Sequence, residues 1–279
     1  PANASGAHRG FAGSRSASFV ALPSLVPWLL GLSSARRQSF SSRALQRRGT
    51  SSGGRSCVAP LPFLPPELCL TEEELLLGVV GVDEAGRGAL AGPVVAAAVS
   101  MAPEVAEQFP GVKDSKRMTP LQREVAYEKL TTSDLVRWSV AVVPKERIDS
   151  INILQATYEA MTEAVEKVGG PARHVLIDGN GIPEQLRTRE WLSCHACVAG
   201  DSKCLLIAAA SVLAKVSRDR IMQKLGASYP EYGLEQHKGY PSKKHVDAIR
   251  LHGPIAAVHR LTFRPTRELL HAAPSHAQA

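Results

Sequence analysis

The stretch that most constrains the fold runs from Gly78 to Val95 and reads GVVGVDEAGRGALAGPVV. A short β-branched run leads into two adjacent acids, Asp83 and Glu84, and a second apolar run begins at Pro93. Short apolar runs bounded by glycine predict buried strands. Carboxylates at the end of a buried strand are costly to desolvate unless a cation compensates them, and their hard oxygens suit Mg²⁺ or Mn²⁺. The stretch therefore predicts either a metal site or two solvated acids at a strand-to-turn junction.

Charge is unevenly distributed along the 279 residues, which carry a net charge of +7. Before Glu67 there are eight arginines and neither a lysine nor an acid. Residues 67–200 carry 13 basic and 20 acidic side chains, whereas residues 201–279 carry 12 basic and 6 acidic ones. An acidic region beside a basic one suits metal chemistry on a polyanion, because acids hold cations and basic side chains hold phosphates.

Residues 1–65 are rich in serine, alanine and arginine, a composition typical of a transit peptide. Their apolar run, residues 19–32, is too short to span a bilayer and contains two prolines. We expect residues 1–65 to be a disordered targeting leader and linker that directs a soluble body to an organelle. A plastid is favoured, with import in one step or two, and the mitochondrion is the alternative. We expect residues 271–279 to be a disordered tail after a folded domain spanning residues 66–270.

The five cysteines include one C-x-x-C pair, Cys194 and Cys197. No second pair stands at the spacing of a zinc finger. Because the segment reads as a strand, the two thiols should lie on opposite faces, as core or half-buried side chains.

The remaining pattern predicts an α/β fold with a mixed central sheet flanked by helices on both faces. Predicted strands cover residues 79–83, 94–100, 135–143, 175–177 and 194–199. Predicted helices cover residues 119–130, 152–168, 204–225 and 242–251, with a loop at 229–241 and an extended piece at 260–265.

Three of these strands lead into acids: Asp83 with Glu84, Asp178, and Asp201. Ligands in open α/β sheets gather beyond the carboxyl ends of the strands. Four carboxylates meeting there would repel one another without cations. Two Mg²⁺ or Mn²⁺ ions about 3.5–4 Å apart would compensate them and serve in-line phosphoryl displacement. The alternative is three unrelated acids at strand ends.

Six motifs in order resemble the ribonuclease HII family, the type 2 ribonucleases H. They are VDEAGRG, KDSK, INILQAT, IDGN, GDSK followed by IAAASVLAKVSRD, and YGLEQHKGYPS, across about residues 78–265. The resemblance implies a ribonuclease H-like fold with a C-terminal helical extension. It also implies a metal-dependent endonuclease that hydrolyses the RNA strand of RNA–DNA hybrids and cuts 5′ of ribonucleotides embedded in duplex DNA. The expected products are 3′-hydroxyl and 5′-phosphate ends, the expected partners are these duplexes and no membrane, and the expected state is a monomer.

The resemblance also implies the roles of individual residues. Asp83, Glu84, Asp178 and Asp201 match the family's four catalytic, metal-binding carboxylates, with Asp83 bridging two ions that activate water and stabilise the leaving oxygen. Substrate contacts fall to a G-R-G element beside the ribose 2′-hydroxyl, a phosphate-binding lysine, a sugar-packing aromatic and a hydroxyl, which are Gly86, Arg87, Gly88, Lys116, Tyr240 and Ser242. Glycine suits this role because it lets the main chain approach a hydroxyl that both donates and accepts.

One departure concerns the sugar-packing aromatic. The family usually has Gly-Tyr-Gly-Thr where this chain has Gly239-Tyr240-Pro241-Ser242. Proline fixes φ and removes an N–H group, which puts the placement of the Tyr240 ring in doubt.

Other charged residues keep two interpretations. We expect Asp219 to be a structural acid paired with a nearby lysine or arginine. Lys203, Lys215 and Arg218 are either a solvated helix face or phosphate contacts, and His237 and Lys238 are either surface residues or nucleic-acid contacts. Two alternatives to the leading function are a related nuclease with relaxed sugar choice and a catalytically silent hybrid-binding protein.

Overall fold

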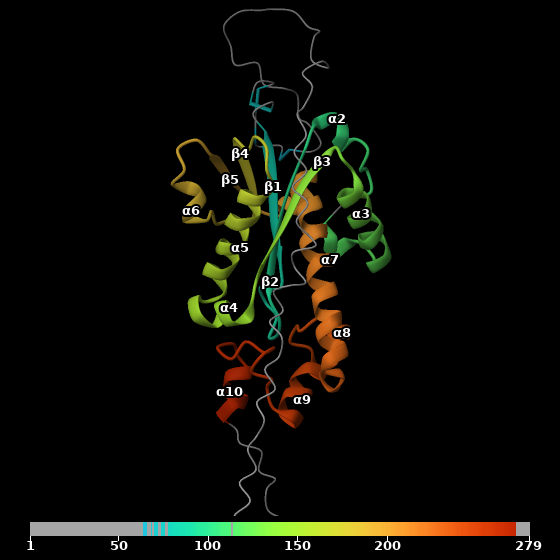
Figure 1. The fold of residues 1–279 in the computed structure, drawn as a ribbon, viewed down its shortest axis with the longest axis vertical. Helices are drawn as coiled ribbons and strands as arrows, with labels where there is room; N and C mark the ends of the chain where they lie inside the picture. The colour runs from blue at the N-terminus through green and yellow to red at the C-terminus, as the bar shows by residue number, and fades with distance from the viewer. Residues whose placement is uncertain are drawn as a thin grey trace, which may run out of the picture. The chain divides into compact units, whose positions relative to one another are not determined.

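A five-stranded mixed sheet forms the centre of the fold (Figure 1). The computed structural model describes residues 64, 65, 68, 70, 71, 74, 75, 78–112 and 114–271. The strands are β1 (Val79–Ala85), β2 (Val94–Met101), β3 (Val136–Val143), β4 (His174–Asp178) and β5 (Ser193–Cys197), in the order β3-β2-β1-β4-β5. β2 runs antiparallel to both of its neighbours, whereas β1, β4 and β5 run parallel to one another. The predicted mixed sheet is confirmed.

Helices follow most of the strands. The α-helices are α2 (Pro103–Ala106), α3 (Pro120–Thr132), α4 (Lys145–Ile151), α5 (Ile153–Lys167), α6 (Glu184–Arg187), α7 (Leu205–Ser228), α8 (Leu234–His237), α9 (Lys243–His252) and α10 (Thr266–His271). In the described part of the chain, the short 3-10 helices are η2 (Ser115–Arg117), η3 (Gly200–Ser202) and η4 (Pro230–Tyr232). The sequence did not predict α4 or α10.

The two faces of the sheet carry different helices (Figure 1). Successive side chains of a strand point to opposite faces, so Val80 and Val82 of β1 pack with the buried alanines of α5. Val79 packs on the other face, in the cluster that contains the buried side of α7. Both faces are therefore covered, as the apolar strands predicted.

α7 lies unusually close to the sheet at Gly81. A Cβ added to Gly81 would come 2.3 Å from the carbonyl carbon of Leu206, so no larger residue fits there. The alanines of the same helix, Ala209, Ala210 and Ala214, are fully buried. The small-residue face of this helix thus brings α7 close to β1, the strand that carries Asp83.

Helix starts follow the sequence signals closely. Thr119 and Gln122 form a reciprocal capping box at the start of α3. Asn152 caps α5, and Ser242 caps α9 by accepting the N–H of His245. These starts were predicted within one residue.

Three predicted segments were wrong in detail. β5 ends at Cys197 rather than at residue 199, so Asp201 lies in η3 and not at the strand end. The predicted loop at 229–241 contains η4 and α8. Residues 261–265 form turns rather than an extended piece, and Asp149 holds them by accepting the backbone N–H groups of Leu261 and Thr262.

A separate apolar cluster forms the predicted C-terminal helical extension. It joins the end of α7 to α9 and to the loop after β1, through Met222, Ile249 and Leu90. In the described part of the chain, no helix is both long and apolar enough to cross a membrane. Leu64, within the predicted leader, is buried in the main core cluster. The rest of that leader up to residue 63, and the predicted tail from residue 272, lie outside the described residues.

The C-x-x-C cysteines lie as predicted. Cys197 packs in the cluster on the α7 face, and Cys194 packs against the cluster on the α5 face. Nothing in this arrangement forms a disulfide or a thiolate metal site among the described residues.

Candidate active site

Three carboxylates meet at one edge of the sheet. Asp83, Asp178 and Asp201 each offer an oxygen, and these oxygens lie within 4.8 Å of one another. The parallel register of β1 and β4 pairs Val82 with Ile177, which sets the next residues, Asp83 and Asp178, side by side. After β5 the chain turns through a left-handed Ala199 (φ 53°) into η3, which returns Asp201 to the same place.

Hydrogen bonds fix the orientation of these carboxylates. Asp83 Oδ1 accepts the Glu84 N–H at 2.7 Å, and Asp178 Oδ1 accepts the Gly200 N–H at 2.7 Å. The Ser211 hydroxyl of α7 also bonds the Asp83 side chain, and its oxygen lies 2.9 Å from that of Ser115 in η2. Because Ser211 donates to the carboxylate, Ser115 donates to Ser211.

Burial and mutual repulsion destabilise the charged form of these carboxylates. Burial raises the pKa of Asp83 well above its usual range, and the charges of Glu84 and Asp178 raise it further. Burial also raises the pKa of Asp201, with Asp178 and Asp114 adding to the effect. Buried oxygens that repel one another favour a bound cation, and an all-carboxylate donor set fits Mg²⁺ or Mn²⁺. The three residues therefore fit a divalent metal site.

Glu84 borders this cluster but does not belong to the group of three. It follows Asp83 on the same strand, so its side chain points to the opposite face of the sheet. Its Oε1 lies 3.4 Å from Arg87 Nη1. Burial raises the pKa of Glu84, Arg87 opposes the shift, and Asp178 adds to it. Glu84 is thus electrostatically coupled to the cluster from its rim.

Lys116 provides a positive charge beside the carboxylates. Its Nζ lies 3.6 Å from Asp201 Oδ2, on a side chain that is 80% exposed. Burial alone would lower the pKa of Lys116, but the charges of Asp201 and Asp83 outweigh it and raise the pKa. An exposed ammonium next to a cation site is suitably placed to contact a phosphate.

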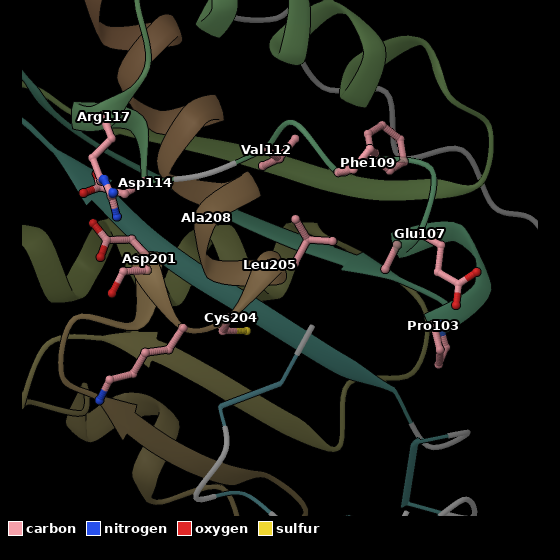
Figure 2. A pocket seen from close by; sticks show the side chains of 14 residues that line it. Pro103, Glu107, Phe109, Val112, Asp114, Arg117, Asp201, Cys204, Leu205 and Ala208 are labelled. Carbon is pink, nitrogen blue, oxygen red and sulfur yellow. The ribbon is translucent and has the colours of Figure 1, made fainter. Parts of the chain in front are cut away.

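A pocket of about 710 Å³ opens next to Asp201. Figure 2 shows Asp114, Arg117 and Asp201 at one end, with Pro103, Glu107 and Phe109 at the other. Lys203 also lines it. The lining of the pocket includes neither Asp83 nor Asp178, so the carboxylate cluster, and not this cavity, is the candidate active site.

The G-R-G loop is held by two fully buried arginines, Arg218 and Arg260. Arg218 donates from Nε to the Pro93 carbonyl, from Nη1 to Lys238 and from Nη2 to Ala91, at 2.9–3.0 Å. Arg260 donates from Nε, Nη1 and Nη2 to the carbonyls of Gly92, Arg87 and Pro93, all at 3.0 Å. Six hydrogen bonds thus fix the loop from within, and five of them end on residues 87–93.

Tyr240 lies against the same clamp. The guanidinium carbon of Arg218 lies 5.2 Å from its ring centroid and Lys215 Nζ lies 5.6 Å from it. The Gly239 carbonyl accepts the Leu90 N–H at 2.8 Å. The proposed sugar-reading elements, the G-R-G loop and Tyr240, are far apart in sequence but are joined through Arg218 and the hydrogen bond between Leu90 and Gly239.

Proline at 241 suits the turn that places Tyr240. The Ser242 N–H donates to the Tyr240 carbonyl at 2.8 Å, which closes a three-residue turn centred on Pro241. The central residue of an inverse γ-turn needs φ near −75°, close to the value that proline imposes. The departure from the usual family motif is thus accommodated by the local backbone.

With the geometry described, the comparisons with known proteins identify the family. The family model for ribonuclease HII matches residues 80–266. The chain belongs to the ribonuclease HII family. A ribonuclease HII of Sinorhizobium medicae is 45% identical over 215 residues, covering 75% of this chain and 94% of its own length. The crystal structure of ribonuclease H2 from Pyrococcus horikoshii aligns with a TM-score of 0.59 and 29% identity, covering 70% of this chain and 98% of that one.

A third comparison bears on the fold alone. Bst-RNase HIII in complex with Mn²⁺ aligns with a TM-score of 0.56 at 19% identity, covering 71% of this chain and 70% of that one.

As a ribonuclease HII, the protein is a ribonuclease H enzyme, and metal-dependent cleavage of RNA–DNA hybrids is general for its family. Membership of this enzyme family therefore excludes the alternative of a catalytically silent hybrid-binding protein.

Several charged residues of this ribonuclease HII lie differently from their predictions. Arg218 is neither a solvated helix residue nor a phosphate contact, because its guanidinium is fully buried. His237 is occupied internally, bonding the Tyr232 carbonyl at 2.8 Å. Asp219 pairs with Lys215 at 2.8 Å, which confirms the predicted pairing with a nearby lysine or arginine.

Sequence reasoning missed Ser211, Arg260 and the buried histidines behind Tyr240. For Arg218 a signal existed: it follows Ser211 and Ala214 at helical spacing and precedes Met222, so it lies on the buried stripe of α7. Arg260 and the histidines carry no such signal, since their burial depends on the docking of the C-terminal extension.

Proposed function

We propose that this ribonuclease HII cuts the RNA strand of RNA–DNA hybrids and cuts 5′ of single ribonucleotides in duplex DNA, leaving 3′-hydroxyl and 5′-phosphate ends. The observation that carries the proposal is the adjacency of two features on β1. The Asp83 cluster could hold metal ions, and the clamped loop that begins three residues later could bind a sugar. A cut directly beside the recognised ribose follows from this adjacency.

Asp83, Asp178 and Asp201 would hold Mg²⁺ or Mn²⁺, with Glu84 contributing from the rim. Bound divalent ions would supply a water of lowered pKa and neutralise charge on the phosphate. Ser211 would keep the Asp83 carboxylate oriented, and Lys116 would bind a phosphate oxygen beside Asp201. A complex of the distant relative Bst-RNase HIII with Mn²⁺ supports a divalent ion on this scaffold.

The sugar would be read by main chain and by one ring. Gly86, Arg87 and Gly88 would present backbone groups to the 2′-hydroxyl. The space beside Gly88 is open, because a Cβ added there would meet no atom within 4 Å, so a sugar could approach the main chain. Tyr240 is half-buried and would pack against the sugar. Ser242 uses its oxygen to cap α9, which leaves its hydroxyl proton available for a phosphate.

The deciding experiment compares three duplexes with Mg²⁺ or Mn²⁺: a hybrid, a DNA duplex with one ribonucleotide, and an all-DNA control of the same sequence. We expect cleavage of the first two and none of the third, with the end chemistry determined by ligation and phosphatase treatment. Equal cleavage of the all-DNA duplex would favour the nuclease with relaxed sugar choice. Cleavage of the hybrid alone would contradict the proposed action on single ribonucleotides.

We further propose an organellar enzyme acting as a monomer, with a catalytic domain spanning residues 66–270. The support for targeting is the acid-free, arginine- and serine-rich composition of residues 1–65. Fusing these residues to a fluorescent protein should direct it to a plastid, with a mitochondrion as the alternative outcome. Retention in the cytosol would contradict targeting, and a dimer in sedimentation would contradict the monomer.

A further inference from the structure

Behind Tyr240 lies a pair of fully buried histidines that the chemistry described above does not use. His245 in the first turn of α9 and His259 in the following loop are both 0% exposed. Their Nε2 atoms lie 3.1 Å apart. His245 Nδ1 lies 3.0 Å from the Tyr240 carbonyl oxygen, and His259 Nδ1 accepts the Ile255 N–H at 2.9 Å.

The partners at the two ends of this row of hydrogen bonds, Ile255 and Tyr240, fix the position of every ring proton of the two histidines. The Ile255 N–H is a donor, so His259 Nδ1 is unprotonated and its Nε2 carries the hydrogen. The Tyr240 carbonyl is an acceptor, so His245 Nδ1 carries a hydrogen and its Nε2 accepts from His259. Both rings are therefore neutral and in opposite tautomers. Burial lowers the pKa of each to about 4, which agrees with neutral rings.

We propose that His245, aligned by His259, is a positioning residue that sets the place of Tyr240 and thereby the cleavage at ribonucleotides. This inference rests on the proposed sugar-reading role of Tyr240. Tyr240 joins Gly239, whose carbonyl binds Leu90, to the start of α9, so its carbonyl is a fixed point of the turn. His245 contacts neither the carboxylates nor the exposed face of the Tyr240 ring.

The surroundings of His245 favour histidine over other side chains in the hydrogen bonds that join His259, His245 and the Tyr240 carbonyl. His237 stacks on His245 with centroids 4.4 Å apart, and Tyr232 packs on His259 at 5.1 Å. An amide side chain can replace one ring nitrogen only. Asparagine places its N–H near the Nδ1 position and could still donate to the Tyr240 carbonyl, whereas glutamine places it near Nε2 and could not. His245→Asn and His245→Gln are thus matched variants of equal chemistry.

The first test is structural and independent of activity. Nitrogen-15 NMR of the full chain at neutral pH should show one histidine locked as the Nδ1–H tautomer, with that signal lost in His245→Asn. A relay in which His245 is an Nε2–H tautomer would overturn the inference.

The second test is a cycle with Tyr240→Ala, measured as kcat on a duplex with one ribonucleotide. We expect His245→Gln to lower kcat about tenfold, the equivalent of one lost hydrogen bond, and His245→Asn to stay within about threefold of wild type. In the Tyr240→Ala background, His245→Gln should change kcat less than about twofold, because it acts through the tyrosine.

The outcomes separate the two proposals. Wild-type kcat in Tyr240→Ala would overturn the sugar-reading role of Tyr240, and the positioning inference with it. An impaired Tyr240→Ala beside an unimpaired His245→Gln would overturn the positioning inference alone. Equal losses in His245→Gln with and without Tyr240 would show a general structural effect, which also overturns it. Thermal unfolding of each variant separates misfolding from misplacement, and a fully unfolded His245→Gln leaves the tautomer measurement to decide.

Discussion

Arg218 occupies the space that a side chain at Gly86 would need: a Cβ at Gly86 would come 2.0 Å from Arg218 Nε. Gly86 also has φ +98°, a conformation that L side chains rarely adopt. Because of this close contact, the Arg218 guanidinium packs directly against the G-R-G loop while it donates hydrogen bonds to three carbonyls. Glycine is therefore required at position 86 by the fold itself.

Gly86→Ala should therefore destabilise the enzyme, by at least about 2 kcal/mol from the positive φ and the displaced arginine. Chemical denaturation measures this loss. Gly88→Ala is the matched control, because its Cβ would meet open space and no positive φ is required there. We expect Gly88→Ala to fold normally but to cleave ribonucleotide duplexes poorly, since the methyl group enters the proposed sugar slot. Equal stability losses in both variants would contradict this account of Gly86.

Asp83→Asn should lower kcat by about 1000-fold or more, because it removes the most buried oxygen donor of the metal cluster. Its stability without metal should be equal to or above that of wild type, since repulsion with Glu84 and Asp178 is relieved. Steady-state cleavage and thermal unfolding in EDTA measure the two effects. Asp247→Asn, an exposed acid on α9, is the control and should retain activity. Substantial turnover by Asp83→Asn would refute the metal site.

Mg²⁺ or Mn²⁺ should stabilise the wild-type protein against heat and should not stabilise Asp83→Asn to the same extent. Binding to the folded state alone contributes about 2.7 kcal/mol at an ion concentration about 100 times Kd. Differential scanning calorimetry with and without EDTA measures the shift. Identical shifts in both proteins would show that the ions bind elsewhere.

Arg260→Met should cost about 3 kcal/mol or more, because the Gly92 and Arg87 carbonyls lose the donor that Arg260 supplies and the Pro93 carbonyl keeps only Arg218. The carboxylate cluster lies on the sheet, so binding of Mn²⁺ should persist in the folded fraction while cleavage at ribonucleotides falls. Arg250→Met removes an exposed arginine on α9 and should leave stability close to wild type. A mild effect of Arg260→Met on both stability and cleavage would contradict the clamp.

His245 and His259 should make the protein less stable as the pH falls. Their folded pKa values of about 4 lie below the unfolded value near 6.5, so the unfolded state binds more protons between these limits. Stability should fall by about 1.4 kcal/mol per pH unit for each histidine over this window. Denaturation at pH 7, 6 and 5 should show a shallower slope in His259→Asn than in wild type. Equal slopes would contradict neutral buried rings.

The sequence was most informative where a pattern repeats along the chain. The acids that follow apolar strands led us to expect that Asp83, Asp178 and Asp201 lie together, and they do. For Asp83 and Asp178 the reason is that parallel neighbours bring their carboxyl ends to one edge of a sheet. Glu84 was grouped with them although strand alternation already argued for a different direction. The match of six ordered motifs to the family supplied the fold and the enzyme class.

Features that depend on docking between distant segments could not be predicted. Arg260 and His259 lie in a loop whose sequence gives no sign of burial, and they are buried because the C-terminal extension packs against the loop after β1. The end of β5 was overestimated because Val198 and Ala199 look apolar and strand-like, whereas Ala199 adopts a left-handed turn. Local propensity was overridden there by the need to return Asp201 to the cluster.

The five hydrogen bonds from Arg218 and Arg260 to the loop after β1 have a consequence for how the enzyme could be divided. The acidic residues stand on strands that form their own core, but the glycine slot is shaped only when residues from 218 to 260 are seated against it. On the proposed function, scission of phosphodiester bonds and discrimination between ribose and deoxyribose would therefore depend on different stretches of the polypeptide. Loosening that seam would yield a catalyst that still holds its ions but no longer distinguishes its sugars.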